Sequence, residues 1–504
     1  MNRLYNKLSK INFVSSNALR AINLYKGIKL KFIDFEFEKA ENPSFTKEEI
    51  INYNKDRKFT TDKNICFAPK KSMIFSFDGS VYVCCENKQY AIGNVKTESV
   101  HDIWFGEKRS FIDKKINTDY NLDYGCSSCK HKILNKDYSL ALAQTFDLNK
   151  DNSSDYPARL DFEIHNTCNL ECVMCGGIYS SSIQANRYKL PAIPMVYKDD
   201  FVQQLEEFIP QVKYINLIGG EPTLIKIYYD IMEKVIELNP SCVIHLQTNA
   251  STLNNKFKNI LGRANFQIGI SIDSLSKNSA EKIRKNLEFD KFMENINYYL
   301  EIYNQNKIKI TINTCPMPEN WQEIIPIIRF CNQHKLPIFF CIVNAPYYNT
   351  FLSTSPAFID KVHDSLFKEM QLLPQNNYFE KNNYNKLKDF LNMLLSWKPI
   401  MDENNVNKLR LSTKSIDELY TEYENILQEN LMHAQKEKLI QQIVNYIKQK
   451  FSSLDDETTA ELLIVLINSI KGEIIPSSED EQIKWAKEFV NTLIYSHEQK
   501  EVFI

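Results

Sequence analysis

The stretch that decides the fold is His165-Asn-Thr-Cys168-Asn-Leu-Glu-Cys172-Val-Met-Cys175-Gly-Gly177. Its three cysteines have the spacing C-x3-C-x2-C. Cuboidal [4Fe–4S] clusters normally take four cysteine thiolates, so three cysteines leave one iron open to a different ligand. On spacing alone, two other interpretations stay open: a zinc site completed by His165 or by a distant cysteine, and three buried thiols without a metal.

The composition is that of an ordinary globular chain. It has 504 residues, which predicts two or three domains, with 43% hydrophobic and 25% charged residues. A net charge of -2 gives no reason to expect nucleic acid or an anionic membrane as partner. The longest uncharged stretch, Leu336 to Ile359, is interrupted by prolines, so we expect no membrane span.

The cysteine content indicates a reducing compartment. Residues Met1 to Lys10 are polar and charged, and no apolar segment of a secretory signal follows them. Twelve cysteines in such a chain favour metal binding over disulfides. We therefore expect a cytoplasmic protein.

Strands and helices alternate from residue 158 onward. The strands are expected at 159–165, 214–218, 243–247, 266–272, 307–313 and 337–343. Helical patterns lie near 200–209, 227–238, 254–262, 278–303 and 320–334. Six strands that are each followed by a helix predict an α/β fold with a parallel sheet. The cysteine loop follows the first strand, at the carboxyl end where chemistry collects in barrels of this kind.

A second motif, Gly219-Gly-Glu-Pro-Thr-Leu224, follows the second strand. Two glycines let the backbone approach a ligand, and the Glu221 carboxylate suits an ammonium group. Alone, the segment reads equally well as a turn with a capping acid. With the cysteine loop before it, it resembles the radical S-adenosylmethionine (radical SAM) superfamily. The resemblance implies a partial (β/α)6 TIM-like barrel, whose open iron chelates SAM while Gly219, Gly220 and Glu221 bind its amino group.

The resemblance extends to three later strand ends, at Thr248-Asn-Ala250, at Ser271-Ile-Asp-Ser274 and at Asn313. Ser271-Ile-Asp-Ser274 and Arg284 are similar to superfamily segments that hold SAM. By that likeness Ser271 and Arg284 contact the SAM carboxylate, Asp273 holds the ribose and Asn313 faces the nucleoside. Ser274 replaces a usual glycine. From the residues alone, each side chain could equally be a helix cap or part of a surface ion pair.

A second cysteine set lies upstream. Cys66, Gly79 and Cys84 give C-x12-G-x4-C, and Cys126 and Cys129 give C-x2-C. Four cysteines hold a zinc ion or one [4Fe–4S] cluster, and spacing does not choose between them. The segment resembles the SPASM/Twitch auxiliary iron–sulfur module, placed here before the barrel. That resemblance implies an auxiliary cluster without an open iron.

The remaining cysteines receive weaker assignments. Cys85 is a spare, either a substitute ligand for Cys84 or a hydrogen donor to the substrate. The other four lie in strands and a helix and are expected in the core: Cys242, Cys315, Cys331 and Cys341.

After about residue 350 the pattern is helical. Helices are expected at 383–397, 415–451, 456–471 and 479–496. Near the N-terminus a strand is expected at 30–37. The expected domains are an extension (1–60), the SPASM/Twitch-like module (61–134), a connector (135–157), the barrel (158–350) and a helical region (351–504).

The implied activity is reductive cleavage of SAM to a 5′-deoxyadenosyl radical that abstracts hydrogen from a substrate. The electron would come from a donor of the flavodoxin or ferredoxin type. A peptide or protein is the first expectation for the substrate, as in modification of ribosomal peptides, and a sugar or amino acid is the alternative. A non-enzymatic zinc or iron–sulfur scaffold is the alternative of another class.

Overall fold

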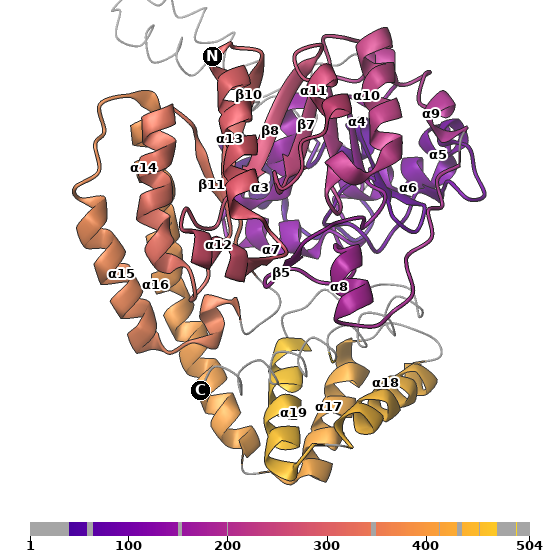
Figure 1. Ribbon diagram of the computed structural model, residues 1–504. Helices are drawn as coiled ribbons and strands as arrows, with labels where there is room; N and C mark the ends of the chain where they lie inside the picture. Colours follow the sequence, from indigo (N-terminus) through magenta and orange to yellow (C-terminus); the bar gives the residue numbers. More distant parts are fainter. Residues whose placement is uncertain are drawn as a thin grey trace, which may run out of the picture. The chain divides into compact units, whose positions relative to one another are not determined.

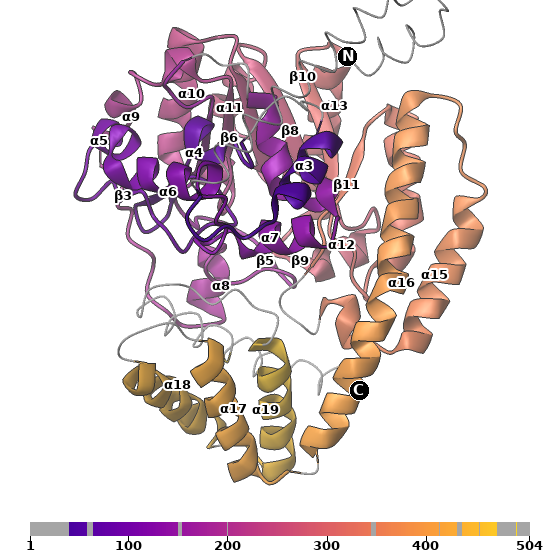
Figure 2. The same cartoon turned by 180° about the vertical axis from the view of Figure 1, so that it is seen from behind.

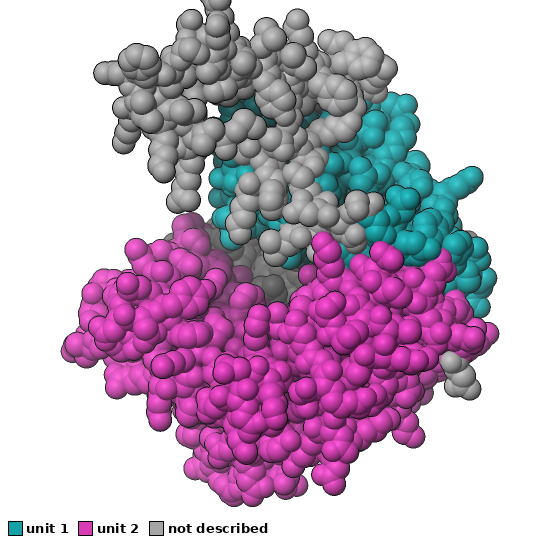
Figure 3. All heavy atoms as spheres, turned by 90° about the horizontal axis from the view of Figure 1, so that it is seen from above, with its two compact units in different colours: residues 1–73, 81–158 teal, residues 74–80, 159–504 magenta. Residues whose placement is uncertain are grey.

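The computed structural model describes residues 40–57, 64–149, 154–198, 200–343, 349–412, 414–430, 436–452, 454–470 and 490 (Figure 1). The strand expected at 30–37 lies outside the described residues, as does the helix expected at 479–496 apart from Val490. The chain divides into two compact units, residues 1–73 with 81–158, and residues 74–80 with 159–504 (Figure 3).

Short helices and two small strands make up most of the first unit. Its described elements are α3 (Lys47–Asp56), α4 (Ala68–Lys71), β2 (Ser80–Tyr82), β3 (Gly93–Asn94), α5 (Val100–Phe105), α6 (Glu107–Asn117), α7 (Ser127–Leu134), η1 (Tyr138–Leu140) and η2 (Leu142–Asn149). Thr46 and Glu49 form a capping box that starts α3, since each accepts a hydrogen bond from the other's backbone N–H. Trp104 is fully buried and its Nε1 donates to Asp155 O at 2.9 Å.

Asp78 and Gly79 form the turn of a β-hairpin. β1 (Ser72–Ser76) turns into β2, and the Gly79 N–H donates to Ser76 O at 2.9 Å. Gly79 has φ +88°, a conformation that glycine adopts without a steric cost. The tip of the hairpin, residues 74–80, is counted with the second unit. There Phe75 stacks on Phe162, with ring centroids 5.1 Å apart.

A parallel sheet forms the centre of the second unit. Its strands are β4 (Arg159–Glu163), β6 (Tyr214–Leu217), β7 (Val243–Thr248), β8 (Asn265–Ser271), β10 (Ile308–Thr314) and β11 (Ile338–Phe340). Each of these strands pairs in parallel with the next along the chain, and β1 follows β4 in the sheet order. All six predicted strands are therefore confirmed.

Helices such as α10, α11 and α13 lie alongside this sheet (Figures 1 and 2), and this part of the chain contains ten helical elements among its described residues. They are α8 (Ser181–Asn186), α9 (Phe201–Gln204), η3 (Ile209–Gln211), η4 (Pro222–Leu224), α10 (Lys226–Leu238), α11 (Asn255–Ile260), α12 (Lys277–Ile283), α13 (Phe289–Asn304), η5 (Trp321–Glu323) and α14 (Ile324–His334). Apolar side chains recur along α10, α13 and α14 and are buried on one side, as amphipathic helices require. The α/β partial barrel is confirmed.

One helix prediction near the site is wrong. The helix expected at 278–303 is broken into α12 and α13 by β9 (Arg284–Lys285). This strand pairs antiparallel with β5 (Glu171–Cys172) of the cysteine loop, so Arg284 lies opposite Cys172. Asn286 then turns the chain with φ +74°. The sequence keeps a helical periodicity through this region. The break arises from pairing with the distant cysteine loop, so the periodicity alone does not predict it.

A further helix prediction needs correction. The helix at 200–209 is limited to α9 because Pro210 and a 3₁₀ turn end the pattern. Within the range expected as a helix at 415–451, the structure describes α17 (Ile416–Asn430) and α18 (Lys436–Phe451). The helix at 456–471 is present as α19 (Asp456–Ile470), and α17, α18 and α19 share one buried core.

The long helix α16 (Tyr378–Ser412) contains the helix expected at 383–397 and packs against α15 (Pro356–Met370). Asn383 on α16 accepts from Ile338 N–H and donates to Leu336 O, both at 2.9 Å. Asn383 therefore provides hydrogen-bond partners for backbone groups at the start of β11, the edge strand of the sheet. None of the described helices is long and apolar enough to cross a membrane.

Candidate functional site

The three cysteines of the first loop lie together beyond the carboxyl end of β4. Cys172 is buried, whereas Cys168 and Cys175 are partly exposed. Burial raises the pKa of Cys168 to about 12, and it also raises the pKa of Cys172 and Cys175. A smaller cause is the charge of the neighbouring thiols: Cys172 raises the pKa of Cys168, and both raise the pKa of Cys175.

Donors from distant elements face these sulfurs. Asn249 Nδ2 lies 3.8 Å from Cys168 Sγ, and Arg284 Nη1 lies 3.9 Å from Cys172 Sγ. Such donors stabilise the thiolate, the form of cysteine that binds metals, and tune the potential of a bound cluster. The donor set therefore fits an iron–sulfur cluster.

Side chains in and before α8 hold the cysteine loop in place. Ser181 Oγ and Ser182 Oγ donate to Cys168 O at 3.1 and 2.8 Å. Asn166 Nδ2 donates to Gln184 Oε1 at 2.6 Å. These anchors were not predicted from the sequence, because serines and amides carry no diagnostic spacing.

Gly219 and Gly220 lie directly against the backbone that leads into the cysteine loop. Gly219 has φ +118°, and a Cβ there would lie 2.7 Å from His165 O. A Cβ on Gly220 would lie 2.6 Å from the carbonyl carbon of Thr167. The Gly220 N–H donates to His165 O at 3.1 Å, and the Glu221 N–H donates to Thr167 O at 2.7 Å. Glycine is needed at both positions, and the two motifs form one site.

The Glu221 carboxylate is buried and fully engaged by the protein. Its Oε1 accepts from Thr223 N–H, Thr223 Oγ1 and Thr248 Oγ1, and its Oε2 accepts from Asn249 N–H at 2.7 Å. Burial raises the pKa of this carboxyl, and the hydrogen bonds oppose that effect. Glu221 thus ties the glycine loop to the end of β7. Its contact with the SAM amino group stays a prediction.

Asp273 and Arg284 form a buried ion pair beside the cysteine loop. Arg284 Nη2 lies 2.6 Å from Asp273 Oδ2, and Asp273 Oδ1 accepts from Cys315 N–H at 2.7 Å. Arg284 Nε is buried and has no hydrogen-bond partner among the described residues. An acceptor from a ligand would satisfy this donor, so a carboxylate such as that of SAM fits here.

Ser271 and Asn313 are joined through Gln247, which the sequence analysis did not single out. Gln247 Nε2 donates to Ser271 Oγ at 2.8 Å, and Asn313 Nδ2 donates to Gln247 Oε1. A Cβ on Gly269 would lie 2.7 Å from Asn313 Nδ2, so this glycine makes room for the bridge. Three neighbouring strands thereby present polar groups on one face of the sheet. Contact of Ser271 and Asn313 with SAM stays a prediction.

The four cysteines of the second set form a separate group in the first unit. Cys66 precedes α4, Cys84 follows β2, and Cys126 and Cys129 lie at the start of α7. Burial raises the pKa of Cys126 to about 12 and is also the largest cause of the raised pKa of Cys66 and Cys129. The pKa of Cys84 is raised chiefly by its hydrogen bond to Cys85 and by burial, and more weakly by the charges of Cys85 and Cys66.

Donors also face this second group. Ala68 N–H lies 3.4 Å from Cys66 Sγ, and Asn87 Nδ2 lies 3.5 Å from Cys126 Sγ. Nearby, Arg57 is buried in an ion pair with Asp147, and its charge lowers the pKa of Cys66. These contacts fit thiolates that bind a cluster.

Cys85 is exposed, next to Cys84. A hydrogen bond between the two thiols is the largest cause of the raised pKa of Cys84. Cys85 is thus adjacent to the proposed ligands, and its role as ligand or hydrogen donor stays a prediction.

Within the described residues, no three His, Cys, Asp or Glu side chains converge tightly enough to share a single metal ion. A four-iron cluster binds its ligands at separate irons, so they need not converge on one point.

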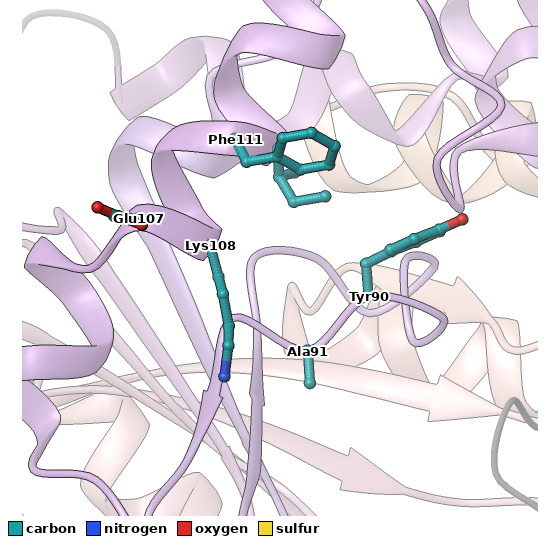
Figure 4. A pocket seen from close by; sticks show the side chains of 6 residues that line it. Tyr90, Ala91, Glu107, Lys108 and Phe111 are labelled. Atoms are coloured by element: carbon teal, nitrogen blue, oxygen red, sulfur yellow. The ribbon is translucent and has the colours of Figure 1, made fainter.

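A pocket of about 270 Å³ lies on the first unit (Figure 4). In this view Phe111 lies above the pocket and Ala91 below it, and Tyr90 and Lys108 lie to either side. Its other lining residues are Ala91, Glu107, Lys108 and Ile112. No cysteine lines this pocket, which is therefore distinct from the cluster site.

The prediction that four cysteines lie in the core is half right. Cys242 and Cys331 are buried, with 1% and 0% of their surface exposed. Cys315 and Cys341 are partly exposed, because each directly follows a strand at the carboxyl edge of the sheet. The prediction is wrong for this second pair.

Family models match both parts of this site. Residues 66–130 match the SPASM model, described as an iron–sulfur cluster-binding domain, and residues 162–331 match the radical SAM superfamily. A GTP 3′,8-cyclase of Helicobacter pylori (strain HPAG1) is 25% identical over 173 residues, 34% of this chain and 51% of that protein. A cysteine-type anaerobic sulfatase-maturating enzyme of Clostridium novyi (strain NT) is 28% identical over 169 residues, 30% of this chain and 44% of that protein.

The chain thus spans about half the length of these curated relatives. Among solved structures, Streptococcus suis SuiB bound to S-adenosylmethionine aligns with a TM-score of 0.34 and 17% identity, over 55% of this chain and 61% of SuiB. The matched segments coincide with the two cysteine groups. This chain therefore carries a radical SAM domain preceded by a SPASM-type iron–sulfur domain.

Proposed function

We propose that this protein is a radical SAM enzyme that modifies a peptide or protein. The observation that carries the proposal is the meeting of three features at the carboxyl ends of neighbouring strands. These are the three-cysteine loop, the Gly219-Gly220 loop packed against it, and the Asp273–Arg284 pair beside Cys172. A protein that only binds metal needs neither the glycine loop nor the Asp273–Arg284 pair.

The cysteine loop would hold a [4Fe–4S] cluster that lacks one protein ligand, and SAM would complete it. When bound, the cluster and SAM together supply an electron and a radical that abstracts hydrogen from the substrate. The chain's own residues orient SAM for this step. Arg284 Nε, which has no hydrogen-bond partner among the described residues, suits the SAM carboxylate, and the Gly219-Gly220 loop with Glu221 would receive its ammonium.

The second cysteine group would hold the auxiliary cluster. Its four cysteines fill a [4Fe–4S] cluster, so it has no free iron for SAM. The proposed roles are transfer of an electron from the substrate radical and shaping of the substrate site. A donor of the flavodoxin or ferredoxin type would supply the first electron.

Two kinds of relative bear on the substrate. The Clostridium novyi relative is named as a sulfatase-maturating enzyme, whose substrate is a protein. Several relatives of comparable identity are named GTP 3′,8-cyclases, which favours a small molecule as the second candidate. The SPASM-type domain before the barrel supports the peptide proposal, in keeping with the family resemblance.

The test compares the two substrate classes directly. Anaerobically reconstituted protein is incubated with SAM, a reductant and either GTP or synthetic peptides translated from short reading frames beside the gene. We expect a peptide to raise 5′-deoxyadenosine formation and to change in mass. Consumption of GTP with no effect of any peptide would contradict the peptide proposal and support the small-molecule candidate.

A further inference from the structure

Two thiols lie side by side at the carboxyl edge of the barrel sheet. Cys315 directly follows β10 and Cys341 directly follows β11. These strands pair in parallel with Thr314 opposite Phe340, and Cys341 N–H donates to Thr314 O at 2.8 Å. The pairing therefore continues to the two cysteines. Neighbouring strands are about 4.8 Å apart, and disulfides join Cα atoms roughly 4.4–6.8 Å apart.

Both cysteines belong to the face of the sheet that carries the polar bridge. Side chains alternate along a strand, so Cys315 shares a face with Asn313, which bonds to Gln247 across Gly269. The apolar residues of β10 are buried on the opposite face. On β11, Phe339 lies opposite Asn313 and is 51% exposed, and Cys341 follows it by two residues. The two thiols thus lie on the same face as the proposed SAM contacts.

The two sulfurs also interact. A hydrogen bond to Cys341 is the largest cause of the raised pKa of Cys315, and the same bond lowers the pKa of Cys341. The charged groups that act on both thiols are Asp273, which raises their pKa, and Arg284, which lowers it. One thiol thus donates to the other, and the lowered pKa of Cys341 favours the thiolate, the form of cysteine that attacks disulfides.

We propose that Cys315 and Cys341 form a dithiol site that converts reversibly to a disulfide by reaction with a low-molecular-weight disulfide. One thiolate attacks a sulfur of that disulfide, which forms a mixed disulfide and releases one thiol. The second cysteine then displaces the other half as a second thiol. The protein pair loses two electrons and two protons, and the small disulfide gains both.

The site is coupled by direct contact to the ion pair that faces the cysteine loop. Cys315 N–H donates to Asp273 Oδ1, and Asp273 pairs with Arg284. Formation of the disulfide would join the ends of β10 and β11 covalently at this point. The inference does not depend on the proposed substrate, because the chemistry belongs to the two thiols alone.

The first test is exchange with glutathione. Anaerobically reconstituted protein is equilibrated with oxidised or reduced glutathione, free thiols are alkylated, and peptides are analysed by mass spectrometry. We expect Cys315 and Cys341 to be recovered linked, two hydrogens lighter, and to return to free thiols under reduced glutathione. The buried thiols Cys242 and Cys331 serve as internal controls and should be alkylated only after denaturation.

A second probe tests the spacing without oxidation. Phenylarsine oxide bridges two adjacent thiols, releasing water, and binds single thiols weakly. Reduced protein should bind it through this pair, and Cys315→Ser and Cys341→Ser should each lose that binding. Full alkylation of both cysteines after oxidised glutathione would overturn the proposal, as would separate glutathione adducts without a linked peptide. Measured iron content confirms in each arm that the cluster cysteines are not the thiols detected.

Discussion

The close approach of Gly220 to the cysteine loop predicts that one added methyl group disables the SAM site. In Gly220→Ala the new Cβ would lie 2.6 Å from the carbonyl carbon of Thr167 and closer still to its carbonyl oxygen, whereas ordinary contact begins at 3.4 Å, so the loop must move by about 1 Å. That movement stretches two hydrogen bonds, Gly220 N–H to His165 O and Glu221 N–H to Thr167 O.

Overpacking costs about 1–3 kcal/mol and each lost hydrogen bond about 0.5–1.5 kcal/mol. We expect the free energy of unfolding to fall by about 2–6 kcal/mol in urea denaturation. A displacement near 1 Å lowers catalysis on the order of 100-fold, so 5′-deoxyadenosine formation should fall to that extent.

The matched control for stability is Gly176→Ala in the cysteine loop. A Cβ at Gly176 meets no atom within 4 Å, so its free energy of unfolding should stay near that of the wild type. Wild-type stability and SAM cleavage in Gly220→Ala would refute the packing argument. Equal destabilisation of both variants would show that the loops do not differ as described.

Four further outcomes are expected. Glu221→Ala should weaken SAM binding by about 1.5–3 kcal/mol, which is about 10- to 150-fold in the Kd measured by equilibrium dialysis, and should leave the iron content unchanged. An unchanged Kd would show that Glu221 only anchors the loop. Removing Cys126 and Cys129 together should preserve SAM cleavage while product formation, followed by mass spectrometry, is lost; wild-type product would make the auxiliary module structural. Cys85→Ala should still cleave SAM but fail to quench the substrate radical, and normal product would exclude it as hydrogen donor. Arg284→Gln leaves a buried carboxylate unpaired and should lower the free energy of unfolding by about 3–5 kcal/mol, which thermal or urea denaturation would measure.

The sequence predicted the elements whose signal is local. The six strands are short apolar runs that alternate with helical segments, and all six are present. The cysteine loop and the Gly219-Gly220 loop follow the first two of them. Order along the chain was enough to place both loops at one edge of the sheet.

Features that depend on distant contacts were not predictable. The helix break at Arg284 exists because this residue pairs with Cys172, and no local breaker marks it. Gln247 joins Ser271 and Asn313 only because three strands lie side by side around Gly269, and the sequence does not show this alignment. Likewise, the exposure of Cys315 follows from where β10 ends relative to its neighbours, which composition does not encode.

The central claim is that the first cysteine group binds a cluster that cleaves SAM, and a single comparison tests it. Wild-type protein and the variant with Cys168, Cys172 and Cys175 changed to Ala are reconstituted anaerobically, then assayed for iron, zinc and 5′-deoxyadenosine. We expect the wild type to hold roughly eight irons and to cleave SAM reductively. The variant should hold about half the iron and cleave no SAM. Stoichiometric zinc with little iron, or equal cleavage by both proteins, would contradict the central claim.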